Sequence, residues 1–298
     1  MGVGRWQLGV EWHDPVSSYR FCRTDDIGLL VDALNRCWAP YHPDQPVETA
    51  ATFKRSIRDL QVWCSSCMVA FSGGDPIGVL IGAKRPSGTL VRRIAVHPDH
   101  RRQGHARHLL ASLGSKLAIL GPPRIVAEVP ETLSPARELF TATGFVEEAQ
   151  LTDYARERGQ DDRDVPRLDG TFVIPVTVDD VAANGLLAED YPQTCWERSV
   201  ETLTARKDEI RGLAVASDER IEACVLCSND GEIVSLRTFV DDGGARLKHL
   251  LSHLPAGGTS ELRFPKVHPA EISQGLLETL GFRGAGVHRL YAARARSD

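Results

Sequence analysis

The most constraining feature of the sequence is the stretch from Thr89 to Leu113, in which a strand, a basic loop and a helix follow one another directly. Apolar residues between Leu90 and Val96 predict a buried strand, which breaks at Pro98 because proline cannot donate to a sheet ladder. Leucines at helical spacing from Leu109 onward predict a helix behind the loop. This layout directs unpaired backbone N–H groups and the positive end of a helix dipole at one point. The stretch therefore predicts an anion site suited to phosphate.

The loop is basic although the chain as a whole is acidic, with a formal net charge of −5. Only one acid, Asp99, lies between Arg92 and His108. The basic residues of that interval are Arg92, Arg93, Arg101, Arg102, Arg107, His97, His100, His105 and His108. Such a cluster can be a solvated surface, but its place on a glycine turn after a buried strand favours the anion site.

A short motif spans the end of the strand and the loop: Val96-His97-Pro98, followed by Arg101-x-x-Gly104-x-Ala106. It resembles the acyl-CoA signature of the GCN5-related N-acetyltransferase (GNAT) superfamily, Val-x-Pro and then Arg/Gln-x-x-Gly-x-Gly/Ala. The resemblance implies that acetyl-CoA is the cosubstrate. It also implies that the backbone of Ile94, Ala95 and Val96 pairs with the pantetheine arm and that loop amides bind the pyrophosphate. The loop residues assigned to CoA in this way are Arg101, Arg102, Gln103, Gly104, His105, Ala106 and Arg107.

The rest of residues 18–156 extends the resemblance. Capping, turn and periodicity signals predict the order βααβββαβαβ, which is the GNAT order. The corner Ala136-x-x-Leu139-Phe140-x-x-x-Gly144-Phe145 is similar to the family's second CoA-side motif, Asn-x-x-Ala-x-x-Leu-Tyr-x-x-x-Gly-Phe. The family's Asn falls on Leu133, and Ser134 beside it is a possible polar substitute for contacting CoA.

The second half of the chain repeats this plan. Leu276-Leu-x-x-x-Gly281-Phe282 mirrors Leu139-Phe140-x-x-x-Gly144-Phe145, and Tyr291 follows Phe282 at the same interval at which Tyr154 follows Phe145. We therefore expect a leader at 1–17, a GNAT domain at 18–156, a polar linker at 157–170 and a degenerate GNAT-like domain at 171–298. The expected fold class is α/β (α+β), with a mixed, mostly antiparallel sheet flanked by helices in each domain.

The two copies differ where the anion site is predicted. In place of the basic loop the second copy has Asp241-Asp-Gly-Gly-Ala-Arg246, without the Arg-x-x-Gly-x-Ala spacing. Two carboxylates at the mouth of an anion site repel phosphate. We therefore expect a single CoA site, in the N-terminal copy.

Catalytic groups are harder to assign. Acetyl transfer requires a deprotonated amine and a donor to the tetrahedral oxyanion, and a backbone N–H near Val96 can be that donor. The acid that many GNAT members carry before Val-x-Pro is replaced by Arg92 and Arg93, and the family's Tyr is replaced by Phe140. The remaining candidates are Glu128 as base, directly or through a water, and Tyr154 as acid. The alternatives are a solvated or salt-bridged Glu128, and a Tyr154 used for packing as its counterpart in the second copy would be.

Other classes of function are disfavoured. The acidic balance argues against nucleic-acid binding, and we find neither an apolar segment of about 18 residues nor the plan of a signal peptide, so a cytoplasmic protein without membrane contact is expected. Two C-x-x-C pairs occur, at Cys64/Cys67 and Cys224/Cys227. The second pair lies in an apolar run that predicts a strand, in which positions three apart point to opposite faces. Neither pair has His ligands at zinc spacing, so buried thiols are favoured over a metal site.

The leading hypothesis is an acetyl-CoA-dependent N-acetyltransferase in which a small-molecule amine or a peptide acceptor attacks the thioester directly in a ternary complex. It would act as a monomer or a homodimer and without a metal. The alternative, motivated by the missing acid and tyrosine, is a non-catalytic CoA-binding sensor or scaffold module. A nucleic-acid binder using the arginine loop is the third hypothesis, and it predicts strongly salt-dependent DNA affinity.

Overall fold

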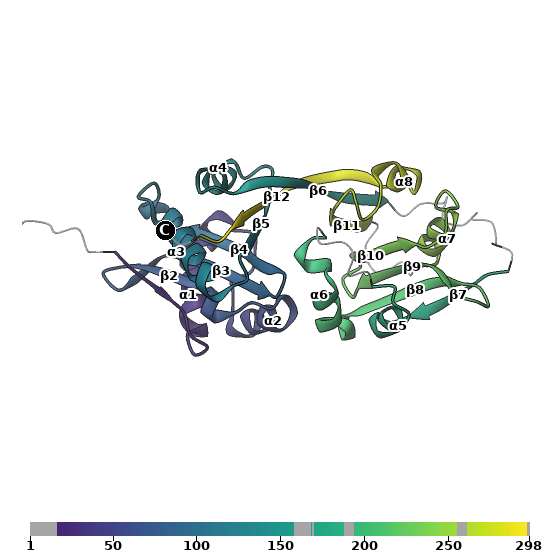
Figure 1. Ribbon diagram of the computed structural model, residues 1–298, viewed down its shortest axis with the longest axis horizontal. Helices are drawn as coiled ribbons and strands as arrows, with labels where there is room; N and C mark the ends of the chain where they lie inside the picture. Colours follow the sequence, from purple (N-terminus) through teal and green to yellow (C-terminus); the bar gives the residue numbers. More distant parts are fainter. Residues whose placement is uncertain (1–16, 158–167, 169, 188–193, 255–260, 297–298) are drawn as a thin grey trace, which may run out of the picture.

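The computed structural model describes residues 17–157, 168, 170–187, 194–254 and 261–296 (Figure 1). The predicted leader, apart from Ser17, and most of the predicted linker lie outside the described residues. The strands are β1 (Ser18–Phe21), β2 (Met68–Ser72), β3 (Asp75–Arg85), β4 (Gly88–Val96), β5 (Arg124–Pro130), β6 (Val146–Glu157), β7 (Phe172–Val176), β8 (Ile210–Ala216), β9 (Ile221–Ser228), β10 (Ile233–Thr238), β11 (Glu261–Val267) and β12 (Arg283–Arg294). The helices are α1 (Ile27–Cys37), α2 (Ala50–Leu60), α3 (His105–Leu120), α4 (Ser134–Ala142), α5 (Val178–Ala183), α6 (Val200–Ala205), α7 (Ala245–His253) and α8 (Gln274–Thr279), with 3₁₀ turns η1 (Ala39–Tyr41), η2 (Cys64–Ser66), η3 (Pro98–His100), η5 (Trp196–Arg198) and η6 (Lys207–Glu209).

The strands form two sheets. The larger has the order β1-β2-β3-β4-β5-β12-β6-β11, and the smaller has the order β10-β9-β8-β7. Neighbouring strands within both sheets are antiparallel except for β4 and β5, which are parallel. The predicted fold class, a mixed and mostly antiparallel sheet flanked by helices, is confirmed.

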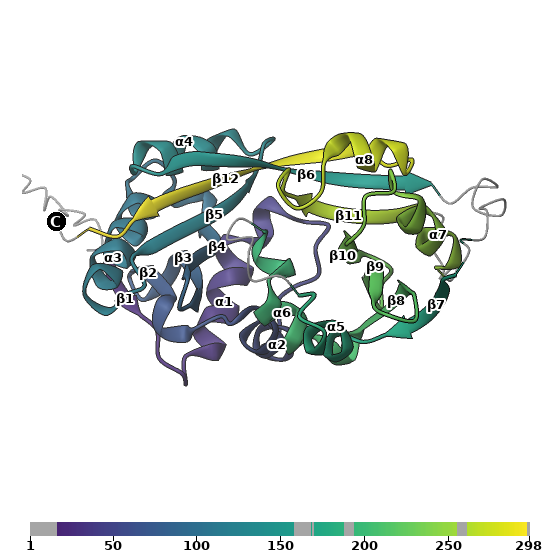
Figure 2. The same ribbon diagram turned by 45° about the vertical axis from the view of Figure 1, so that its right-hand side comes forward.

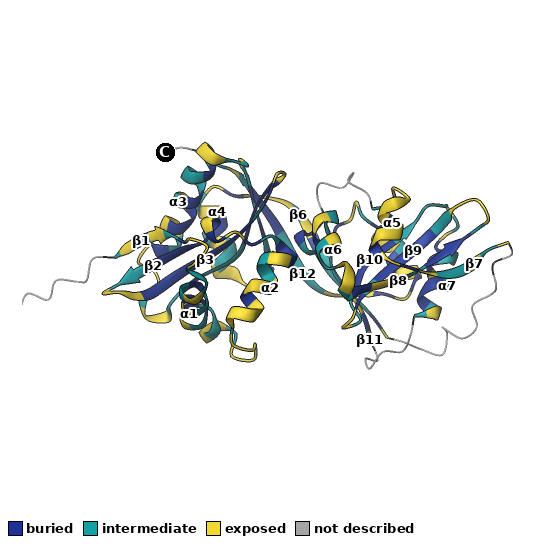
Figure 3. Cartoon of the chain, turned by 90° about the horizontal axis from the view of Figure 1, so that it is seen from below, coloured by how far each residue is buried: buried dark blue, intermediate teal, exposed yellow. Residues whose placement is uncertain are grey.

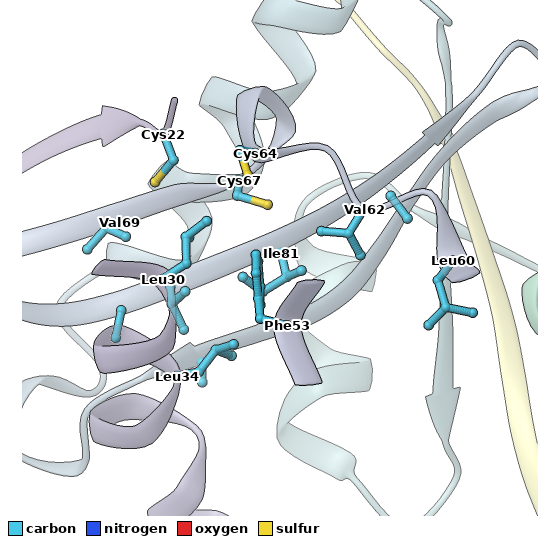
Figure 4. Packing of buried hydrophobic residues seen from close by; sticks show 14 of the residues in the cluster. Cys22, Leu30, Leu34, Phe53, Leu60, Val62, Cys64, Cys67, Val69 and Ile81 are labelled. Atoms are coloured by element: carbon cyan, nitrogen blue, oxygen red, sulfur yellow. The ribbon is translucent and has the colours of Figure 1, made fainter. Parts of the chain in front are cut away.

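Helices cover both faces of the sheet in the N-terminal half, residues 17–157. In α1 the buried residues Leu30, Ala33, Leu34 and Cys37 recur at helical spacing, and this stripe packs on one face of the sheet together with α2. Figure 4 shows part of this core, including the buried thiols of Cys64 and Cys67. On the opposite face, leucines of α3 pack with Phe140 of α4.

The C-terminal half, residues 168–296, repeats this layering. Leucines of α7 and α8 pack on one side of the smaller sheet, and residues of α5 and α6 pack on the other. Cys224 lies in the second of these clusters, whereas Cys227 packs against the first. The expectation that these two cysteines point to opposite faces is therefore confirmed, and all seven cysteines are free thiols.

The last strands of the two halves cross over into each other. β6 begins beside the end of β12 and ends beside β11, whereas β12 begins beside the end of β6 and ends between β5 and β6 (Figure 2). Each strand has 12 residues, which corresponds to about 40 Å of extended chain. Strands of this length extend from one half of the molecule into the other, and Figure 3 shows β6 and β12 joining the two halves. The N-terminal sheet therefore contains a strand that the sequence places at the end of the C-terminal half.

The exchange has a local two-fold symmetry that follows the internal repeat. Leu151 of β6 lies opposite His288 of β12, flanked by Gln150 opposite Arg289 and by Thr152 opposite Val287. One consequence concerns the two repeat-related tyrosines. Tyr154 packs in the core of the C-terminal half, with Phe264 and Phe282, whereas Tyr291 packs in the core of the N-terminal half.

Candidate acyl-CoA site

The central strand β4 separates from β5 beyond its first residues. Among the described residues, their parallel pairing consists of Thr89 with Ile125 and Leu90 with Val126, although β4 continues to Val96 and β5 to Pro130. On its other side β4 stays paired with β3, and His97 N donates to Ile77 O over 2.8 Å. Because hydrogen-bonded and non-bonded pairs alternate in an antiparallel ladder, the backbone groups of Ile94 and Val96 point toward the opening, whereas those of Ala95 bond to β3.

A bulge in β4 shapes the same opening. Arg93 is paired with Ile81 and Val91 with Gly82, so Arg92 is an extra residue. Arg93 donates to Glu48 Oε2 over 2.6 Å, and its guanidinium carbon lies 5.4 Å from the ring centroid of Trp38. Burial, together with the charge of Arg93, lowers the pKa of Arg92 from its ordinary value. The two positions where the family often has an acid are thus occupied by cations close to the opening.

The predicted anion loop, Arg101–Arg107, is held in an unusual backbone conformation. Arg102 has φ +62° and Gly104 has φ +88°, and a bulky residue with positive φ is a strained feature that clusters at functional sites. The residues of the loop are exposed except for His105, which is buried, and Ala106, which is intermediate. The first N–H groups of a helix lack intrahelical acceptors, and the first bond of this kind in α3 runs from His108 N to Gly104 O, over 3.0 Å.

His105 anchors this loop to the edge strand. Its Nδ1 lies 2.6 Å from the hydroxyl of Tyr19 in β1, and its Nε2 lies 3.3 Å from Gln103 Oε1. Burial lowers the pKa of His105, and the neighbouring His100 and His108 lower it further. His105 therefore contributes its side chain to the position of the loop, which leaves its backbone N–H for a ligand.

Two further groups flank the opening. Tyr41, in η1, donates its hydroxyl to Val96 O over 2.7 Å, and the guanidinium of Arg101 lies 5.5 Å from the Tyr41 ring centroid. Ser134 is exposed at the first position of α4, which packs on the same side of the sheet as α3. The structure therefore places Ser134 on the helical layer that also carries the loop.

In the C-terminal half the equivalent helix start is closed by a side chain. The helix α7 also follows a glycine with positive φ, Gly244 at +87°. Asp242 accepts hydrogen bonds from the N–H groups of Gly244 and Arg246, each over 3.0 Å, and from Arg246 Nη1 over 2.9 Å. Its carboxylate occupies the place where a phosphate would bind the helix start.

Glu128 lies in β5 next to the opening but is tied into the contact between the two halves. Its side chain is only 6% exposed. Glu128 Oε1 accepts the backbone N–H of Trp196 over 2.6 Å, and Oε2 lies 3.0 Å from Lys266 Nζ. The salt-bridged alternative for Glu128 is thus present, and its proposed role as base stays a prediction.

Tyr154 is not brought to the loop or to the opening of β4. It is 7% exposed within the core of the C-terminal half, and burial raises the pKa of its hydroxyl. Its surroundings favour the packing alternative, and its role as acid stays a prediction without support from position. Phe140, at the family's tyrosine position, is buried against Phe145 and lies 6.0 Å from the Tyr291 ring in a stacked arrangement.

Four further ionisable residues near Glu128 were not predicted from the sequence: Asp153, Glu197, Lys266 and His288. Lys266 Nζ bridges Glu128 and Glu197, at 3.0 and 3.2 Å, and His288 Nδ1 lies 3.4 Å from Asp153 Oδ2. Burial alone would lower the pKa of Lys266, but the two carboxylates raise it above its ordinary value, so Lys266 stays cationic. These residues come from β6, η5, β11 and β12, and no local spacing links them. The internal repeat makes His288 the counterpart of Leu151 in the sequence, and the two residues lie opposite each other in the sheet.

Two features are absent from the described residues. No group of three or more His, Cys, Asp or Glu side chains is arranged to hold a metal ion in that part of the chain. Within the same residues, no helix combines the length and apolar character needed to cross a membrane.

Known proteins are similar to this chain in part of its sequence and in its fold. The family model "Acetyltransferase (GNAT) family" matches residues 29–145. A tandem GNAT protein from the clavulanic acid biosynthesis pathway has a similar fold, with a TM-score of 0.62 at 17% identity over 95% of this chain and 100% of that one. A GCN5-related N-acetyltransferase from Sphaerobacter thermophilus has a TM-score of 0.67 at 14% identity over 94% of this chain and 96% of that one. No curated protein matches the sequence.

The family match covers the half that carries the basic loop, and the shared fold extends over nearly the whole chain. Acetyl transfer is the general chemistry that this family supports. Residues 29–145 thus match the GNAT acetyltransferase family, and the fold of nearly the whole chain is similar to that of a tandem GNAT protein.

Proposed function

We propose that this protein is an acetyl-CoA-dependent N-acetyltransferase that binds CoA in its N-terminal half, at the loop Arg101–Arg107 and the open edge of β4. The acceptor, a small-molecule amine or a peptide, attacks the thioester directly while both substrates are bound. The amides of the loop would hold the pyrophosphate, and the backbone of Ile94 and Val96 would pair with the pantetheine arm.

One contrast supports this proposal most strongly. The helix start of α3 presents its backbone amides on an exposed basic loop, whereas the equivalent amides of α7 are bound by the protein's own Asp242. Helix N-termini bind phosphate through such amides together with the helix dipole. The Asp242 carboxylate at the start of α7 is an example of a negatively charged group bound by such amides.

The opening between β4 and β5 supplies the chemistry of transfer. A backbone N–H of β4 that points into it can donate to the oxyanion of the tetrahedral intermediate without any particular side chain. The thioester then lies beside Arg93 and, on the β5 side, near Glu128. Loss of the thiolate completes the transfer.

The test combines binding with turnover. Purified protein is titrated with CoA in a calorimeter and then incubated with radiolabelled acetyl-CoA and a panel of amines and peptides. Gly104→Glu places a side chain and a negative charge in the loop and should reduce CoA affinity at least 100-fold. Gly74→Glu is the matched control, because Gly74 also has positive φ (+94°) and open space at its Cβ but lies in the β2–β3 turn.

The same experiment distinguishes the enzyme from the non-catalytic alternative. That alternative is favoured by Arg92 and Arg93, which replace the family's acid, and by the buried Phe140, which replaces its tyrosine. Tight CoA binding with neither transfer to any amine nor enhanced thioester hydrolysis would support a CoA-binding sensor or scaffold. If Gly104→Glu and Gly74→Glu bind CoA equally well, the site has been assigned to the wrong place.

A further inference from the structure

A row of ionisable side chains crosses the large sheet on the face opposite α3. Residues directly opposite each other in neighbouring strands point to the same face, as do residues two apart in one strand. Glu128 lies opposite Leu290, two positions from His288. His288 lies opposite Leu151, two positions from Asp153. Glu128, His288 and Asp153 therefore share one face, in three adjacent strands.

Residues of the C-terminal half complete this row. Lys266 of β11 donates its backbone N–H to Asp153 Oδ1 over 2.8 Å and its ammonium to Glu128 and Glu197. The 3₁₀ turn η5 lies over the row, since Trp196 N donates to Glu128 and Glu197 contacts Lys266. The row thus begins at β5, beside the opening of β4, and draws its members from both halves.

His288 differs from the other members in its hydrogen bonding. Its Nδ1 is buried without a hydrogen bond among the described residues, and it lies 3.4 Å from Asp153 Oδ2. The side chain as a whole is 17% exposed. Because the two nitrogens lie on different edges of the ring, an Nδ1 directed at Asp153 leaves Nε2 for a ligand. A carboxylate beside one nitrogen orients a histidine that works as a base through the other.

We propose that His288, oriented by Asp153, is the general base that takes a proton from the acceptor amine. This inference rests on the proposed acetyltransferase function, and it names the catalytic group that function lacks. The position fits the reaction, because β12 adjoins β5 and neighbouring strands lie about 5 Å apart. Because β5 lies between β4 and β12, an acceptor amine that binds over β5, on the face that carries Glu128, is one strand spacing away from the imidazole.

The charge balance of the row favours His288 over Glu128. Both oxygens of Glu128 are bound by donors, one of them the cationic Lys266. Burial lowers the pKa of His288, the charge of Lys266 lowers it further, and Asp153, Glu128 and Glu197 oppose this shift without reversing it. A histidine with a lowered pKa is neutral near pH 7, which is the state required of a base.

The acceptor ammonium gives one proton to His288 Nε2, and the resulting amine attacks the thioester carbonyl carbon to form a C–N bond. The tetrahedral intermediate collapses with cleavage of the C–S bond, and the nitrogen loses its second proton, which the CoA thiolate takes up. The protonated His288 returns its proton to solvent, so the products are the amide and CoA thiol.

This assignment gives the strand exchange a function. The base is carried by the last strand of the half that lacks an open anion loop, and it reaches the site because β12 inserts beside β5. Its symmetry mate on β6 is Leu151, which is fully buried and cannot titrate. The tandem arrangement would thus assemble one active site from two copies.

The test is His288→Gln, which retains a hydrogen-bonding side chain of similar size but cannot act as a base. We expect kcat/KM to fall about 100-fold or more, with CoA affinity and the circular dichroism spectrum unchanged. The wild-type kcat/KM should rise with pH along a limb whose midpoint lies below that of free histidine, and this limb should be absent in the variant. The control is His253→Gln, because His253 is an exposed histidine on α7.

A second variant distinguishes loss of the base from loss of side-chain packing. His288→Ala should be inactive at neutral pH and should regain activity with added imidazole, which restores a base but not packing. Undiminished kcat/KM and an unchanged pH limb in His288→Gln would overturn the proposal. Wild-type protein that binds CoA but acetylates no amine would instead overturn the proposed function, so the two failures are distinguishable.

Discussion

In both halves an equivalent helix, α3 or α7, begins after a glycine with positive φ, but the preceding loop is basic in the first half and acidic in the second. Gly104 and Gly244 have nearly the same backbone conformation, with φ +88° and +87°. Arg102 stands two residues before Gly104, and Asp242 stands two residues before Gly244. In the first half the amides lie on an exposed basic loop, and in the second they are bound by the Asp242 carboxylate. A duplicated fold can therefore close an anion site with one side chain. The backbone before the glycine differs between the halves, because Arg102 has φ +62° in the first, whereas Gly243 has φ +64° in the second.

The same halves depend on each other for their cores. Tyr154 completes the hydrophobic core of the C-terminal half, and Tyr291 completes that of the N-terminal half. Trp196 of η5 also enters the N-terminal core, where its Nε1 donates to Leu60 O over 2.8 Å. The half with the closed loop is thus required for the structure of the half with the open one.

The largest expected effect comes from truncating the exchanged tyrosines one at a time. Tyr154→Ala and Tyr291→Ala each remove a buried aromatic ring, so we expect each to lower the free energy of unfolding by about 3–5 kcal/mol. Only Tyr291→Ala should also weaken CoA binding, because Tyr291 packs against Phe140 on the α3 side of the sheet. Urea denaturation and CoA titration of both variants provide the measurements.

The different effects of Tyr154→Ala and Tyr291→Ala on CoA binding test whether each tyrosine packs in the opposite half. If Tyr154→Ala weakened CoA binding and Tyr291→Ala did not, the strands would not be exchanged in solution. A conservative variant, Tyr291→Phe, keeps the ring and should bind CoA as the wild type does.

The comparison of the two loops can be tested by transferring the carboxylate. Arg102→Asp places an acid two residues before Gly104, in a backbone region that aspartate tolerates. We expect CoA affinity to fall about 100-fold, equivalent to about 2.7 kcal/mol, because a carboxylate would replace a cation beside the loop amides and repel the phosphate. Arg102→Ala removes the cation alone and should cost less than tenfold. If Arg102→Asp and Arg102→Ala bound CoA with equal affinity, a carboxylate at this position would not be sufficient to prevent CoA binding.

The sequence predicted the local elements well, because caps, turns and apolar periods act within a few residues. The order βααβββαβαβ predicted for residues 18–156 is found from β1 to β6. The strand exchange was not predictable in this way. β6 and β12 occupy corresponding places in the two repeats, so either could pair beside β5, and the choice depends on contacts between distant segments.

The candidate site likewise has a local part that the sequence predicts and a part that depends on contacts between distant segments. The loop Arg101–Arg107 is contiguous, and its motif, its helix and its charge are all legible in the sequence. The row of Glu128, Asp153, Lys266 and His288 comes from four strands that are brought together by the exchange. Glu128 alone was singled out, because it lies in the strand next to the motif.

The smallest expected effect concerns the closed loop itself. Burial alone would raise the pKa of Asp242, but hydrogen bonds from Arg246 and from two backbone amides outweigh it and hold the pKa below its ordinary value. A lowered pKa in the folded state means that Asp242 stabilises the fold above its unfolded pKa of about 3.9, and that this stability is lost as the pH falls through the folded value. Asp242→Asn should therefore lower the free energy of unfolding by about 1 kcal/mol at pH 7, and the difference from wild type should shrink below about pH 4. The neighbouring Asp241 is exposed, so Asp241→Asn should change stability by less than about 0.5 kcal/mol. A pH-independent difference for Asp242→Asn would mean that its carboxylate charge does not hold the amides of α7.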